Sequence, residues 1–308
     1  MREINYISSD GKSTVFGYIW HPDVKAGTKV RGVLQLVHGF AEHALRYRDF
    51  AEFMTRQGYV VCAHDQLGHG NTAAGKFGYI GKSGHKLLAK DTYKFTMLIK
   101  KELGSDIPIT LMGFGAGSLV VRYVCSLWGM EYSGAVFFGT SCGGAGINVL
   151  YRMFSASKLK AKTGEKEAGW VNKRLHSRNG KTFRNSEKGT SWLTRDAAQL
   201  AAYEADPLCG FGLTYGACLD LLKLTRITNS RDWPSRMPKN LPIYLLSGLD
   251  DPVGGFGRGV IEVYSELVRA GSKDVEIKLH EDARHDLIFE LNRQEIYEDI
   301  AKWLEGLQ

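Results

Sequence analysis

Three glycines at alternate positions, Gly113, Gly115 and Gly117, constrain this chain of 308 residues more than any other feature. They follow the apolar run 109–112 and precede the helix-like run 118–128, so we predict that a strand turns sharply into a helix here. Where strand and helix crowd together, the outer positions leave no room for a Cβ. In the elbow G-x-S-x-G, the middle residue presents a nucleophile at the tip of the turn. The tip of this elbow is Gly115, which has no side chain.

Strand and helix patterns alternate on both sides of the elbow. Apolar strands are predicted at 33–37, 59–63, 109–112, 134–138, 243–246 and 275–279, after an opening hairpin near 4–20, and helices at 47–57, 87–103, 118–128, 259–270 and 293–306. This alternation favours an α/β fold with a mostly parallel central sheet flanked by helices. Ligands of such sheets bind at the carboxyl ends of the strands.

The alternation lapses between about 141 and 239. We therefore predict that residues 1–140 and 240–308 form the core, and that 141–239 are inserted as a cap or lid over the ligand edge of the sheet. A single core with an insertion is common for α/β chains of this length.

The net charge of +7 is concentrated in the predicted cap. Residues 151–190 contain eleven lysines and arginines but only three glutamates. A basic strip of this kind suits peripheral contact with an anionic membrane, and the alternative is a solvated surface without a partner. Aromatic residues are sparse in it and no nucleic-acid-binding signature accompanies it, so we expect no nucleic acid to bind.

Composition excludes several other classes of protein. A hydrophobic content of 44% and a charged content of 24% are those of ordinary soluble globular proteins. No apolar run approaches the roughly 20 residues that span a bilayer, and the first residues lack a secretion signal, so we expect a cytoplasmic protein. The five cysteines are dispersed and odd in number, which indicates neither a disulfide framework nor a zinc site.

Two polar residues follow the last two predicted strands, at the edge where ligands bind. Asp251 comes after the strand 243–246, and His285 after the strand 275–279. With the elbow they occur in the order nucleophile position, acid and histidine, which is the order of the triad in α/β-hydrolases. Asp250 is the neighbouring alternative. We choose Asp251 because the Pro-Val-Gly that follows it fits a turn aiming one carboxylate.

Acyl transfer also requires backbone donors for a developing oxyanion. We assign these to the N–H groups of Phe40, which follows the strand 33–37, and of Ala116, which opens the elbow helix. The substrate pocket is predicted to be lined by His38, Gly39, Phe114, Thr140 and Ser141. His69 is interpreted as a structural histidine that holds its loop.

Four motifs in the correct order resemble the monoacylglycerol lipase and lysophospholipase-like branch of the α/β-hydrolases, sometimes grouped with serine aminopeptidases. They are residues 38–43 (His-Gly-Phe-Ala-Glu-His) with Arg46 and Tyr47, 65–70 (Asp-Gln-Leu-Gly-His-Gly), 248–254 (Gly-Leu-Asp-Asp-Pro-Val-Gly) and 283–285 (Ala-Arg-His). The resemblance implies a serine hydrolase that cleaves fatty-acyl esters beneath a lid, without metal or cofactor. Its ligand would be a small acyl ester or lipid-like molecule. By this match His285 is the base and Asp251 the acid, while Phe40 and Ala116 are the oxyanion donors.

The elbow departs from this family at its tip. Members that resemble this chain carry Gly-His-Ser-Met-Gly, whereas residues 113–117 are Gly-Phe-Gly-Ala-Gly. Loss of a catalytic serine commonly removes a factor of about 10⁶ in turnover. Ser118 and Cys142 are candidate replacements, but neither is predicted to stand at the tip of an elbow.

The sequence therefore predicts impaired acyl-enzyme chemistry and leaves three functions open. The first is a catalytically inactive pocket protein that binds a lipid or ester-like ligand. The second is an enzyme in which His285, oriented by Asp251, acts as a general base without a covalent step. The third is an ordinary ester hydrolase in an inactivated form, whose activity serine at position 115 would restore.

Overall fold

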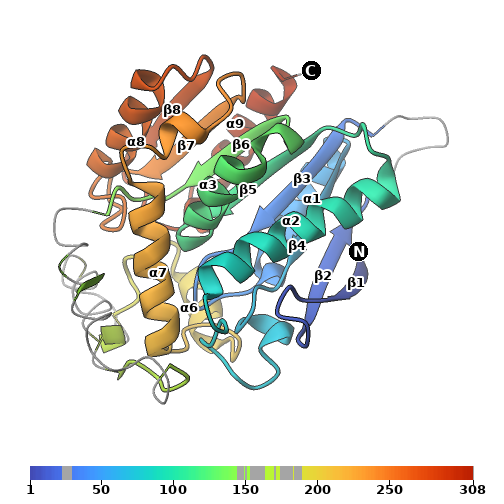
Figure 1. Ribbon diagram of the computed structural model, residues 1–308. Helices are drawn as coiled ribbons and strands as arrows, with labels where there is room; N and C mark the ends of the chain where they lie inside the picture. The colour runs from blue at the N-terminus through green and yellow to red at the C-terminus, as the bar shows by residue number, and fades with distance from the viewer. Residues whose placement is uncertain are drawn as a thin grey trace.

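In the computed structural model the strands form one sheet in the order β1-β2-β4-β3-β5-β6-β7-β8 (Figure 1). The strands are β1 (Arg2–Ile7), β2 (Thr14–Trp20), β3 (Gly32–Val37), β4 (Tyr59–His64), β5 (Ile109–Phe114), β6 (Gly134–Phe138), β7 (Ile243–Gly248) and β8 (Val275–His280). β1 and β2 form an antiparallel hairpin, β2 pairs antiparallel with β4, and the remaining pairs are parallel. The structure describes residues 1–22, 30–143, 149, 151–152, 164–169, 171–173, 183 and 189–307.

Helices cover both faces of this sheet. They are α1 (Arg48–Arg56), α2 (Gly84–Leu103), α3 (Ala116–Trp128), α6 (Ala197–Ala205), α7 (Tyr215–Thr228), α8 (Arg258–Arg269) and α9 (Arg293–Glu305). Short 3-10 turns are η1 (Ala44–Tyr47), η2 (Gly70–Ala73), η3 (Gly129–Glu131), η4 (Pro234–Arg236) and η5 (Leu287–Phe289). The predicted fold class, a mostly parallel sheet flanked by helices, is confirmed.

Two apolar clusters, one on each face, hold the helices to the sheet. Met112 of β5 packs in one cluster with Phe50 of α1 and Ile300 of α9. Leu111, the preceding residue, packs in the other cluster with Val121 of α3. Successive side chains of a strand point to opposite faces, so a strand that is covered on both sides is apolar throughout. This explains why β5 reads as a continuous apolar run.

Between β6 and β7 the described chain forms α6 and α7 and adds no strand to the sheet. α7 packs against α2 and α3 (Figure 1). Most of the basic run predicted at 151–190 lies outside the described residues, which include Arg152, Lys166 and Lys173. The boundaries of the cap at 141–239 stay a prediction. Among the described helices, none combines the length and the apolar character needed to cross a membrane.

Candidate active site

The carboxyl ends of the neighbouring strands β3, β5 and β6 lie side by side at one edge of the sheet. Val37 of β3 lies opposite Gly113 of β5, and Phe114 of β5 lies opposite Phe138 of β6. The loops that follow these strands therefore start at the same edge of the sheet. They carry the predicted oxyanion loop, the elbow and Gly139.

The elbow has the tight geometry that its glycines predict. Gly115 has φ +52° and ψ −119°, a conformation that side chains rarely adopt. A Cβ at Gly113 would lie 2.6 Å from the carbonyl oxygen of Gly117, and a Cβ at Gly117 would lie 2.3 Å from the carbonyl oxygen of Val37. The outer glycines are therefore required because the start of α3 rests on the backbone of β3 and β5.

His285 and Asp251 meet at this edge, although 34 residues separate them in the chain. The imidazole Nδ1 lies 2.9 Å from Asp251 Oδ2, and Asp251 Oδ1 accepts the N–H of Val253 at 2.8 Å. The Asp251 side chain is fully buried and that of His285 is 10% exposed. Since Asp251 holds Nδ1, the free ring nitrogen Nε2 points away from the carboxylate.

The imidazole of His285 faces the tip of the elbow. A Cβ placed on Gly115 would lie 2.8 Å from Nε2, closer than real Cβ atoms approach a neighbour, so the ring occupies part of the space a side chain would take. Gly139 lies beside the same ring, because its Cβ would be 2.9 Å from His285 Cε1. The structure thus brings Gly115, Asp251 and His285 together around one point.

The surroundings of His285 favour its protonated form. Burial lowers the pKa of the imidazole, but the charge of Asp251 and its hydrogen bond raise the pKa, with smaller contributions from Asp286 and Glu42, to about 9. Nε2 therefore carries a proton at neutral pH. A folded-state pKa above the unfolded value of 6.5 stabilises the fold fully below pH 6.5, and this contribution is lost as the pH rises through about 9.

We expect the ring protons of His285 to titrate near pH 9 in an NMR pH series. Asp251→Asn should lower the pKa of His285, because the charge and hydrogen bond of Asp251 are lost and only the smaller effects of Asp286 and Glu42 oppose burial. A control substitution, Asp250→Asn, alters the neighbouring residue and should leave the titration near pH 9. A titration of His285 below pH 7 in the unaltered chain would contradict this assignment.

The loop after β3 is held by its own side chains. His38, predicted to line the pocket, is buried, with Nδ1 2.7 Å from the carbonyl oxygen of Gly39. Its Nε2 accepts the N–H of Gln66 at 3.0 Å. Burial and the neighbouring His69 hold the pKa of His38 well below its ordinary value, so the ring is neutral and its role here is to fix the loop.

The assignment of the N–H groups of Phe40 and Ala116 as oxyanion donors stays a prediction. Among the described residues, no group accepts the N–H of Phe40, whose ring stacks on His69 at 5.3 Å between centroids. Ala116 is the first residue of α3, where N–H groups lack a helical acceptor and the helix dipole favours negative charge. Gly39 touches the elbow, since its Cβ would lie 3.3 Å from the carbonyl oxygen of Phe114.

Sequence reasoning assigned no role to Glu42, which organises the oxyanion loop. The carboxylate is 5% exposed and accepts hydrogen bonds from the N–H of Gly39, the hydroxyl of Tyr47 (2.8 Å) and the guanidinium of Arg46. Oε1 accepts the bonds from Gly39 and Tyr47, and Oε2 accepts the bond from Arg46. The presence of an acidic residue, Glu42, within the motif 38–43 could have indicated this role from the sequence.

Arg46 links this loop to two other segments. Its guanidinium lies 3.6 Å from a carboxylate oxygen of Asp286, next to His285 in the chain. It also lies over the rings of Phe289, at 4.1 Å, and Tyr203 of α6, at 4.7 Å. The cation therefore joins the oxyanion loop, the histidine loop and the inserted segment.

The other predicted pocket residues are only partly open. Phe114 is 6% exposed, and its ring stacks on Phe138 at 4.4 Å within the core. Thr140 is fully buried, and its hydroxyl accepts a hydrogen bond from Arg122 at 3.2 Å. Ser141 is half-buried, and its carbonyl oxygen accepts from the same arginine at 3.0 Å. Ser118 donates its hydroxyl hydrogen to the carbonyl oxygen of Gly115, below the tip.

The inserted segment reaches the histidine through residues that sequence reasoning did not assign. The carbonyl oxygen of Trp192 accepts the N–H of His285 at 3.4 Å, and the two rings lie 5.2 Å apart. The carbonyl oxygen of Leu193 accepts the N–H of Asp286 at 2.7 Å. Trp192 therefore forms one wall beside the imidazole.

Two groups of possible metal ligands lie among the described residues, and neither includes the site above. They are His43 with Asp206 and Cys209, and His280 with Glu295 and Asp299, with ligand atoms within 4.8 Å of one another. In the first group, His43 Nε2 already lies 2.9 Å from Asp206, a hydrogen bond that accounts for the approach. The expectation of a site without metal or cofactor stays a prediction.

A family model matches most of the chain, and the similar proteins include lipases and an esterase. Residues 28–292 match the family model described as serine aminopeptidase, S33. A monoacylglycerol lipase of Mycolicibacterium smegmatis is 25% identical over 93% of this chain and 91% of its own length. A monoglyceride lipase of Mus musculus is 25% identical over 97% of this chain and 88% of its own. The crystal structure of a thermostable carboxyl esterase from Bacillus coagulans in complex with glycerol superposes with a TM-score of 0.92, at 27% identity, covering 99% and 98% of the two chains.

Proposed function

Because this chain belongs to the serine aminopeptidase S33 family, we propose that its site takes a small acyl ester or lipid-like ligand and does not form an acyl-enzyme. The chain is an α/β-hydrolase similar to monoacylglycerol lipases, and a similar esterase holds glycerol in its crystal structure. These likenesses support an ester of a fatty acid with a small alcohol as the ligand class.

The observation that carries the proposal is Gly115 facing His285 Nε2. Gly115, at the tip of the elbow, has φ +52° and ψ −119°, which supports a strained turn of the kind that presents a nucleophile, and Asp251 contacts His285. A covalent intermediate requires an oxygen or sulfur atom at this tip, because the elbow is what aims it at the carbonyl carbon between the oxyanion donors. Gly115 supplies neither. A bound ester is therefore expected to dissociate without being cleaved.

Binding without cleavage is tested by adding short- and medium-chain monoacylglycerols and following both calorimetry and tryptophan fluorescence. Trp192 lies against His285, so occupancy of the site should change its emission. The change should disappear in Trp192→Phe and persist in Trp128→Phe, which removes a tryptophan stacked on Tyr93. The lipid recovered afterwards should be uncleaved. Absence of binding to every ester, or cleavage at rates usual for lipases, would contradict the proposal.

The second candidate function is general-base catalysis by His285 on a water molecule at the Gly115 gap. The contact between Asp251 and His285 favours it, but the raised pKa opposes it. With a pKa of about 9, roughly one molecule in a hundred carries the basic form at pH 7. Hydrolysis that rises with pH up to about 9 and is absent in His285→Ala would favour this candidate over binding alone.

A further inference from the structure

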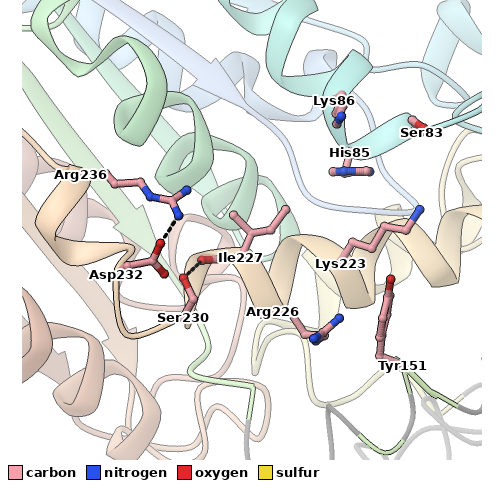
Figure 2. Close-up of a pocket in the computed structure, with 10 residues that line it drawn as sticks. All are labelled: Ser83, His85, Lys86, Tyr151, Lys223, Arg226, Ile227, Ser230, Asp232 and Arg236. Atoms are coloured by element: carbon pink, nitrogen blue, oxygen red, sulfur yellow. Dashed lines mark hydrogen bonds and ion pairs between the residues drawn. The ribbon is translucent and has the colours of Figure 1, made fainter. Parts of the chain in front are cut away.

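A second pocket lies away from the elbow, between the first turn of α2 and the helix α7 (Figure 2). Its volume is about 550 Å³ and its lining shares no residue with the Gly115 site. We call it the α2–α7 pocket. We propose that it binds a phosphate-bearing anion, through His85 of α2 and the basic side chains around it.

A buried hydrogen bond to Asp220 orients His85, which lines this pocket. His85 Nδ1 lies 2.6 Å from Asp220 Oδ1, and the two side chains are 7% and 5% exposed. Asp220 also accepts the N–H of Gly84 at 2.8 Å and the ammonium of Lys223 at 3.1 Å. Burial raises the pKa of Asp220, but the hydrogen bond from His85 and the charge of Lys223 bring it below the ordinary value. Asp220 is thus an ionised carboxylate whose oxygens are already engaged.

The other nitrogen of His85 is left without a partner. Among the described residues no group forms a hydrogen bond with Nε2, and His85 lines the pocket. Because Asp220 holds Nδ1, Nε2 is the ring atom left to contact a ligand, and an N–H at this atom would donate to a phosphate oxygen. A side chain that is nine-tenths buried and fixed by Asp220 is a preorganised donor for an oxyanion.

The rest of the lining is strongly basic. Four cations, Lys86, Lys223, Arg226 and Arg236, line the pocket, with Asp232 as the carboxylate among the lining residues. Arg236 pairs with Asp232, whereas Lys86 has no ion-pair partner among the described residues. Figure 2 shows His85 and Lys86 on the α2 side, with the arginines and Lys223 on the other.

The positive charge and the hydrogen-bond donors of the α2–α7 pocket favour a phosphate-bearing ligand. Among the described lining residues, cations outnumber carboxylates by four to one. Arginine, lysine and protonated histidine are the donors that bind phosphate oxygens by charge-assisted hydrogen bonds. A volume of about 550 Å³ exceeds that of phosphate alone, so a phosphorylated small molecule or a lipid headgroup also fits. The shared chemistry is the phosphate monoester.

The position of the pocket gives such a ligand a structural effect. α7 packs against α2 and also against α3, the helix that begins at the elbow. An anion held by His85 and Lys86 on one side and by α7 on the other would tie these helices together. Because a ligand that binds only the folded form stabilises it, occupancy should raise the melting temperature.

The test is a titration of the whole chain with inorganic phosphate and with glycerol phosphate at constant ionic strength, followed by calorimetry and thermal unfolding. Lys86→Ala and His85→Asn should each raise the dissociation constant about tenfold, as expected for loss of one charge-assisted hydrogen bond. The matched control is Lys101→Ala. It removes the same charge from an exposed site fifteen residues further along α2, about 22 Å away at 1.5 Å per residue.

Vesicles distinguish the two sources of phosphate. The comparison is between phosphatidylcholine vesicles with and without phosphatidic acid. Binding of acidic vesicles that weakens in Lys86→Ala and is displaced by soluble phosphate identifies a headgroup, whereas binding of the soluble monoester alone identifies a small molecule. Absence of phosphate binding overturns the proposal. So does an equal loss in Lys101→Ala, or an affinity that Lys86→Ala and His85→Asn both leave unchanged. The readout does not depend on Gly115, so it is independent of the ester proposal.

Discussion

Replacing Gly115 with serine is expected to raise the hydrolysis of monoacylglycerols and p-nitrophenyl esters by about a thousandfold or more over the unaltered chain. With Phe40 and Ala116 proposed as oxyanion donors and Asp251 in contact with His285, we expect the hydroxyl to be the only missing part. The upper limit is the factor of about 10⁶ that loss of a catalytic serine commonly costs. The gain in activity should stay below this factor. A Cβ at position 115 would lie 2.8 Å from His285 Nε2, so the imidazole has to shift away to make room for the serine.

Two controls separate chemistry from geometry. Gly115→Ala introduces the same Cβ without the hydroxyl, so it should gain no activity and should report the strain of a side chain at φ +52°, about 1–2 kcal/mol of unfolding free energy. Gly115→Ser with His285→Ala should lose the gained activity, because no base remains. If all of these variants are silent, the pocket has diverged from ester chemistry. If Gly115→Ala gains as much as Gly115→Ser, the hydroxyl is not the cause.

Removing the carboxylate of Glu42 should lower the free energy of unfolding by about 3–5 kcal/mol, the cost of leaving a buried charge without its partner. Glu42 is 5% exposed and holds Arg46, the hydroxyl of Tyr47 and the N–H of Gly39. In Glu42→Ala the guanidinium of Arg46 keeps its contacts with the rings of Phe289 and Tyr203, but Asp286, at 3.6 Å, is then its one carboxylate partner among the described residues. Urea unfolding monitored by circular dichroism measures the difference.

Glu52→Ala is the matched control, since it removes an exposed carboxylate from the neighbouring helix α1 and should change stability by less than about 0.5 kcal/mol. Tyr47→Phe removes one of the hydrogen bonds to Glu42 and should cost about 1 kcal/mol. If Glu42→Ala lowers the free energy of unfolding by no more than Tyr47→Phe does, the carboxylate of Glu42 does not stabilise the loop. In the Gly115→Ser background, Glu42→Ala should also lower kcat, because the N–H of Phe40 loses its support.

Much of the architecture was predictable because it follows from local patterns. The apolar run of β5 and the glycines at alternate positions 113, 115 and 117 predicted the elbow, and the alternation of elements predicted the parallel sheet. The elbow helix, predicted over the run 118–128 with Ala116 at its opening, begins at Ala116, since Gly115 alone makes the turn and the helix starts directly after it. The predicted resemblance to monoacylglycerol lipases is confirmed by the family match and by similar lipases.

The sequence by itself determined the positions along the chain where polar residues follow strands, because strand periodicity and turn residues are local properties. Only the tertiary structure decided which of them meet. Motif order had paired Asp251 with His285, which are 34 residues apart, but nothing in the sequence paired His85 with Asp220, which are 135 residues apart. Such contacts depend on how loops leave the sheet and how helices pack across it. The positive charge on His285 was decided in the same way, because it arises from burial beside a carboxylate that folding alone brings there.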